Sequence, residues 1–163
     1  MDPAYSGVWL EQEMNGDRSF LFLRPYDART YFANIFTYGS DGDGLKPKQR
    51  INCKAWLTPL GGATFLTLEP LNCEHFAGLG DKPPYLVAKV SLANGALQLR
   101  LVNGDHEAVK NANDSQALQA VIEKAVNSDA LYGGEASVFK KTDDKALIRS
   151  VLEAFRPEGC TEW

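Results

Sequence analysis

The residues best suited to chemistry lie in two short groups around the only two histidines of the sequence. One group is Cys73-Glu74-His75 and the other is Asp105-His106-Glu107. Thiolate, imidazole and carboxylate are the usual zinc ligands, but zinc sites repeat them at short, fixed spacings. Neither group repeats such a spacing, and the two lie far apart in the chain. We therefore expect solvated loop residues, no metal ligands and no bound cofactor.

The sequence gives no better support for nucleophilic catalysis than for a metal site. No Gly-x-Ser-x-Gly turn is present, and Cys73 and His75 are too close in sequence to suggest a nucleophile with its base. Asp41-Gly42-Asp43-Gly44 resembles the start of a calcium loop, but the following residues LKPKQR lack the later carboxylates. We expect no catalytic residues, and hence a protein that is not an enzyme.

Composition indicates one folded domain over residues 1–163. The apolar fraction is 44% and the charged fraction is 23%, both ordinary for a globular chain. The net charge is −4 and no basic run is longer than Lys140-Lys141, which argues against a nucleic-acid partner. No segment approaches the roughly 20 apolar residues of a transmembrane helix.

The beginning of the sequence and its cysteines bear on the compartment. MDPAYSG has neither the basic start nor the apolar block of a signal peptide. It is typical of a mature exported domain after removal of an upstream signal, which predicts a periplasmic or envelope location; a cytoplasmic location is the alternative. Cys53, Cys73 and Cys160 cannot all pair within the chain. Three free thiols are favoured, and a Cys73–Cys160 bridge is the alternative in an oxidising compartment.

The hydrophobic pattern is mainly that of β-strands. Asn15-Gly16 and Asn94-Gly95 are strong signals for tight hairpin turns between such strands. Antiparallel strands joined by short turns can close into a barrel, which removes exposed edges. We therefore predict a mainly β, barrel-like domain, with an open bent sheet or a sandwich as the alternative. The eight predicted strands are 7–14, 18–24, 29–39, 50–57, 63–69, 85–92, 96–102 and 135–141.

The Asn94-Gly95 turn also fixes a register. Because side chains alternate across a strand, the hairpin around this turn places one set of apolar residues on a single buried face. These residues are Leu86, Ala88, Val90, Leu97, Leu99 and Leu101.

Two amphipathic helices interrupt the β pattern. The first, 115–126, starts at Ser115 and should cross between the seventh and eighth strands, returning the last strand to pair with the first. The second, 142–155, starts at Thr142 and has an apolar stripe that includes Ile148, Leu152 and Phe155.

The strand at 29–39 is apolar on both faces. Tyr31, Ala33 and Ile35 share one face. The other face carries Phe32, Phe36 and Tyr38, and an apolar area of this size should not be left bare. We expect helix 142–155 to cover Phe32 and Phe36. A ligand surface or a dimer interface is the alternative.

Gly7-Val8-Trp9 at the head of the first strand resembles the G-x-W that opens the first strand of lipocalins and related calycin barrels. The resemblance implies a cup for a small apolar molecule, with Trp9 buried at one end. The T-D-Y motif of lipocalins has no match, since Thr142-Asp143-Asp144 follows the last strand. The chain also looks like small exported or lipid-anchored bacterial domains of unknown function, because these contain strands that resemble KAWLTPLGG and FLTLEPL.

These observations favour a non-enzymatic binding module for a small apolar ligand. Small inward residues would leave room for it, and the long segment 71–84 could cap one end of the barrel. The alternative is an envelope structural or interaction domain with a filled core. The predicted ligand-lining residues are Tyr31, Ala33, Ile35, Ala55, Phe65, Phe76, Leu79 and Ala88.

Overall fold

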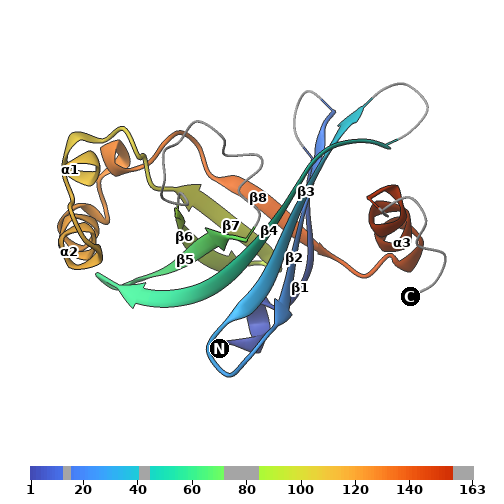
Figure 1. Ribbon diagram of the computed structural model, residues 1–163, viewed down its shortest axis with the longest axis horizontal. Helices are drawn as coiled ribbons and strands as arrows, with labels where there is room; N and C mark the ends of the chain where they lie inside the picture. Colours follow the sequence, from blue (N-terminus) through green and yellow to red (C-terminus); the bar gives the residue numbers. More distant parts are fainter. Residues whose placement is uncertain (13–15, 41–44, 72–84, 156–163) are drawn as a thin grey trace.

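The chain folds into a closed barrel of eight antiparallel strands in the order β1 to β8, with β8 pairing back onto β1 (Figure 1). The computed structural model describes residues 1–12, 16–40, 45–71 and 85–155. The prediction of a mainly β barrel is confirmed, and closure excludes the open sheet and the sandwich. The strands are β1 Gly7–Gln12, β2 Arg18–Pro25, β3 Tyr31–Ser40, β4 Leu45–Leu60, β5 Ala63–Pro70, β6 Leu86–Ala93, β7 Ala96–Leu101 and β8 Ser137–Thr142.

Both predicted amphipathic helices form, at opposite ends of the molecule with the barrel between them (Figure 1). The first helix starts at Ser115 as predicted, although its N-cap is Asp114; the predicted start of the second at Thr142 was wrong, because Thr142 ends β8 and Asp144 is the N-cap. Both aspartate carboxylates accept backbone N–H groups of the first turn. No helix in the described part of the chain is long and apolar enough to cross a membrane. The helices are α1 Glu107–Lys110, α2 Ser115–Ala125 and α3 Lys145–Ala154, with 3₁₀ turns η1 Pro3–Tyr5 and η3 Asp129–Leu131.

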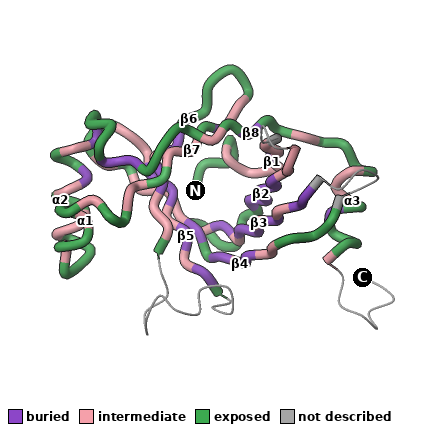
Figure 2. Tube along the Cα trace, turned by 90° about the horizontal axis from the view of Figure 1, so that it is seen from above, coloured by how far each residue is buried: buried purple, intermediate pink, exposed green. Residues whose placement is uncertain are grey.

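The barrel interior forms the main core of the protein. Figure 2 shows buried segments along β2 to β5. Trp9 is 2% exposed, as predicted, and its indole N–H donates to the carbonyl of Tyr5 over 2.9 Å. The Lys141 ammonium on the neighbouring strand β8 lies 5.3 Å from the centre of the Trp9 ring, within the range of a cation–π attraction.

The small residues of the interior do not leave a cavity beside them. Ala55 lies between Tyr31 on β3 and Leu68 on β5, two large neighbours on the adjacent strands. Ala33, Cys53 and Ala55 expose no surface at all. A cavity large enough for water would leave part of its lining accessible. The barrel is therefore filled by its own side chains at this level.

The β6–β7 hairpin follows the predicted register in all but one position. Asn94 and Gly95 adopt φ angles of 53° and 74°, the left-handed values that a tight hairpin turn requires. Val90 pairs with Leu99, and Ala88, Val90 and Leu97 are buried, while Leu86 and Leu99 are partly buried against the same core. The prediction for Leu101 was wrong: it is 49% exposed, because the pairing of β7 with β8 stops at Leu99.

Helix α3 covers the outer face of β1 to β3. Phe36 is 3% exposed and its ring lies 5.1 Å from that of Phe155, which confirms the predicted cover. Tyr38 is fully buried, and its hydroxyl donates to the carbonyl of Val151 over 2.6 Å. Phe32 departs from the prediction, since it is only partly buried and lies outside the cluster that α3 covers.

Helix α2 covers a second outer face, formed by β5 and β6. Phe65 is 2% exposed and packs there with Ile122 and Val126 of the helix region and with Leu131 and Tyr132 after it. The described residues therefore form three apolar clusters, one inside the barrel and one beneath each long helix.

Replacing Val151 by Asp should lower the free energy of unfolding by about 3 kcal/mol or more, because a carboxylate would be buried against Phe20 and Tyr38 without a partner. The matched control is Leu152→Asp on the next residue, which is 42% exposed and should cost less than about 1 kcal/mol. Urea unfolding measures both changes. Equal losses for the two variants would contradict the packing of α3 described above.

Stability should fall at high pH. Burial raises the pKa of the Cys53 thiol to about 11 and raises the pKa values of the Tyr31 and Tyr38 phenols. Below about pH 9 both states hold these protons, and above it the unfolded chain releases them first. The urea midpoint should therefore drop between about pH 9 and 11. The urea midpoint of the Cys53→Ala variant should drop less over the same interval. A midpoint of the parent protein that stays constant between these pH values would contradict the prediction.

Candidate functional site

The structure does not bring the predicted ligand-lining residues together around one cavity. Tyr31, Ala33, Ala55 and Ala88 are buried in the barrel core, and Ile35 packs against it partly buried. Phe65 lies on the opposite side of the barrel wall, beneath α2, because it belongs to the alternate face of β5. Phe76 and Leu79 fall outside the described residues.

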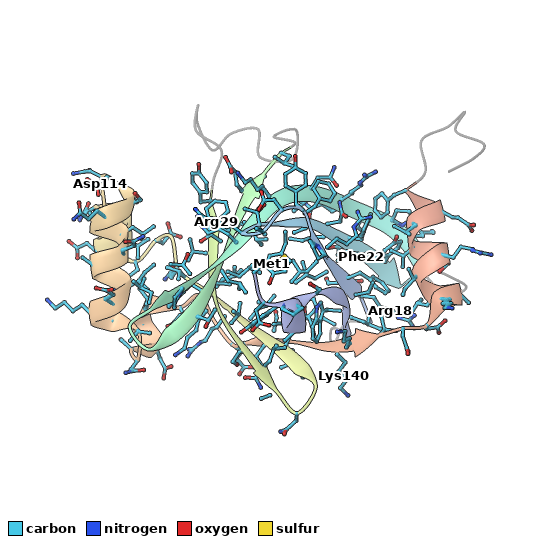
Figure 3. The ribbon with its side chains drawn as sticks, turned by 90° about the horizontal axis from the view of Figure 1, so that it is seen from below. Met1, Arg18, Phe22, Arg29, Asp114 and Lys140 are labelled. Carbon is cyan, nitrogen blue, oxygen red and sulfur yellow. The ribbon has the colours of Figure 1, made fainter. Side chains whose placement is uncertain are left out.

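Two cavities instead lie outside the barrel, each between the wall and a helix. The first is a groove of about 680 Å³ between the outer face of β2 to β4 and helix α3, and we call it the α3 groove. Figure 3 shows Phe22 on the side of the barrel nearest α3. The groove is lined by Arg24, Phe32, Asn34, Phe36, Arg50, Lys145, Ile148, Arg149, Leu152, Glu153 and Phe155.

The strand register explains the floor of the α3 groove. Outward residues of β3 alternate with inward ones, so Phe32, Asn34 and Phe36 follow one another along the same face. Phe32 is opposite Arg24 on β2, and Phe36 is opposite Arg50 on β4. An amide is thus placed between two aromatic rings, and an arginine comes from the strand on each side.

A chain of hydrogen bonds joins the two arginines across this floor. The Arg24 Nη2 donates to Asn34 Oδ1 over 2.7 Å, and Asn34 Nδ2 donates to Asn52 Oδ1 over 2.7 Å. The same Asn52 oxygen accepts from Arg50 Nε over 3.2 Å. Asn34 is only 2% exposed, so its two bonds satisfy an amide that would be costly to bury alone. The two amides therefore link both guanidinium groups within the lining of one groove.

Each guanidinium group also lies over an aromatic ring of β3. The Arg24 Cζ lies 5.5 Å from the centre of the Phe32 ring, and the Arg50 Cζ lies 5.9 Å from that of Phe36. Both distances are within the range of a cation–π attraction. Each arginine is thus restrained by a ring and by an amide.

The α3 groove is positively charged on a chain whose net charge is −4. Helix α3 adds Lys145 and Arg149 to the two arginines of the sheet, and among the described residues of the lining Glu153 is the one carboxylate. Among the described residues, no carboxylate forms an ion pair with Arg24 or Arg50. Like charges held together without a counter-charge favour the arrival of an anion.

The second cavity, which we call the α2 groove, has about 610 Å³ and a different chemistry. Its lining joins aromatic Trp56 and Tyr85, whose ring centres are 6.3 Å apart, to apolar side chains such as Leu118 and Ile122, to neutral polar groups and to the cap residue Asp114. Figure 3 places Asp114 at the start of α2, at the end of the molecule opposite α3. No cationic side chain lines the α2 groove within the described part of the chain.

Within the described ranges, no three histidine, cysteine or carboxylate side chains gather in a way that could hold a metal ion. His106 lies at the start of α1, and the Cys73 group falls outside those ranges.

Comparison with models of protein families, with curated proteins and with solved structures finds no match. What the structure itself defines is a closed, eight-stranded antiparallel barrel with two helix-covered outer faces.

Sequence reasoning missed Arg24, Asn34 and Arg50. The available signal was Asn34 itself, a polar residue at the centre of an otherwise aromatic outer face of β3. Its partners could not be recognised, because Asn52 and Arg50 reach it only through the pairing of β3 with β4.

Replacing Asn34 by Ala should destabilise the fold by about 1–3 kcal/mol, because the buried amide and its two partly buried hydrogen bonds, to Arg24 and Asn52, are lost. Gln98→Ala is the matched control: it also truncates an amide on a strand, but Gln98 is exposed, and it should change stability by less than about 0.5 kcal/mol. Thermal unfolding compares the two. A loss for Gln98→Ala as large as that for Asn34→Ala would show that the Asn34 network contributes nothing specific.

Proposed function

We propose that this protein is a non-enzymatic binding module for a small molecule with an apolar body, and that the molecule binds in the α3 groove. The supporting observation is the groove itself, whose volume of about 680 Å³ falls within the range of ordinary ligand sites. Phe32, Ile148, Leu152 and Phe155 give it apolar walls. The barrel then acts as a rigid scaffold.

This proposal moves the ligand from the inside of the barrel to its outer face. The fully buried Ala33 and Ala55 leave no space beside them for a guest molecule. Phe32, in contrast, remains partly accessible next to a helix that covers its neighbour Phe36. An aromatic ring at the edge of a covered face is well placed to contact a ligand.

Binding suits the chemistry of the groove better than catalysis does. Arginine stays protonated in proteins, so Arg24 and Arg50 are hydrogen-bond donors and not general bases. Their restraint by rings and amides is the arrangement expected for recognition. The predicted periplasmic or envelope location is independent of this proposal and stays a prediction.

The neutral apolar dye N-phenylnaphthylamine tests the proposal, because its fluorescence increases on transfer to an apolar site. The protein should bind the dye, and Leu152→Trp should abolish binding by filling the α3 groove. The matched control is Gln119→Trp, which places the same bulk in the α2 groove and should leave binding unchanged. Both positions are exposed on helices, so both variants should fold.

The other outcomes are equally clear. Loss of binding only in Gln119→Trp would move the ligand to the α2 groove. Equal binding in both variants would place it elsewhere, for example in the barrel. No binding by the parent protein would favour the second candidate, a structural or interaction domain, which the filled barrel also fits. Native mass spectrometry of the protein from its own organism would then check for a retained small molecule.

A further inference from the structure

We infer that the ligand of the α3 groove is an amphiphile whose head group is an oxyanion, a carboxylate or a phosphate, bound between Arg24 and Arg50. This inference rests on the proposed function and adds the class of ligand to it. Two features of the groove carry it: the unneutralised charge and the way in which that charge is held.

The positive charges of Arg24 and Arg50 lack a neutralising carboxylate among the described residues. Arg24 and Arg50 are linked through Asn34 and Asn52, and neither forms an ion pair within the described residues. On a net acidic chain, surface arginines have many carboxylates available as partners. These two instead donate to the linked amides Asn34 and Asn52, and an anion bound between them would neutralise their charge.

Toward the described residues, most of the N–H donors of the two guanidinium groups form no hydrogen bond. Arg24 uses Nη2 on Asn34 and Arg50 uses Nε on Asn52, from the five N–H donors that each arginine has. Two parallel N–H donors of one guanidinium can bind two oxygens of a carboxylate or a phosphate in a bidentate manner. Because Asn34 is buried and both its bonds are made, the arginines are oriented before the ligand arrives.

The remainder of the groove indicates an apolar tail. Ile148, Leu152 and Phe155 of the α3 region form a wall beside the arginines, and Phe32 and Phe36 form the floor. A free inorganic anion would leave this apolar surface unused. A neutral lipid would leave the two arginines without a counter-charge. An amphiphile uses both.

The test compares dodecanoate with dodecanol by isothermal titration of the full chain. Dodecanoate should bind at least about tenfold more tightly, since charge-assisted hydrogen bonds form only with the anion. Arg50→Gln and Arg24→Gln should each weaken dodecanoate binding far more than dodecanol binding and so remove most of that preference. Lys124→Gln on α2 makes the same charge change at the other end of the molecule and should leave the preference intact.

Further ligands distinguish a carboxylate from a phosphate head group. They also distinguish a failure of the anion inference from a failure of the proposed function. Dodecyl phosphate binding more tightly than dodecanoate would assign the head group to phosphate. Inorganic phosphate binding as tightly as either amphiphile would overturn the need for a tail. Equal affinity for dodecanoate and dodecanol, unaffected by Arg50→Gln, would overturn the anion inference and leave the proposed function standing. No binding of any amphiphile would overturn both.

Discussion

The rest of the structure depends on one constraint: β2 and β3 are apolar on both faces. Leu21 and Ala33 point into the barrel, while Phe20 and Phe36 point out of it. A strand wall of this kind cannot face water on either side, so the domain needs a closed interior and an external cover at once. Helix α3 supplies that cover, and the hydroxyl of Tyr38 fixes its position through the Val151 carbonyl.

The limits of that cover create the groove. Helix α3 packs over Phe20, Phe22, Phe36 and Tyr38 but not over Phe32. At this margin the buried amide of Asn34 lies between Phe36, which the helix covers, and Phe32, which it does not. An amide buried at such a margin requires partners, and it takes them from the strands on both sides. The requirement to satisfy one amide thus draws two arginines to the edge of an apolar surface.

The filled interior changes how a small barrel can bind a ligand. An eight-stranded barrel has just enough interior for side chains or for one small guest. Here Trp9, Tyr31 and the leucines occupy it, and each alanine lies beside larger neighbours. Packing of this density gives a rigid wall, and a rigid wall can hold side chains on its outside as well as on its inside. The two covering helices therefore provide both stability and the sides of the external cavities.

The sequence by itself determined the local features of the protein. Alternation along each strand showed that β3 has two apolar faces, Asn94-Gly95 set the β6–β7 turn, and the stripes of both long helices could be read from their spacing. These features depend on residues close together in the chain. Only the tertiary structure decided whether the interior is a cup or a core, because that depends on which side chains meet across strands. It also brought Arg24 and Arg50 to Asn34, since strand pairing, and not sequence spacing, places three separate strands side by side.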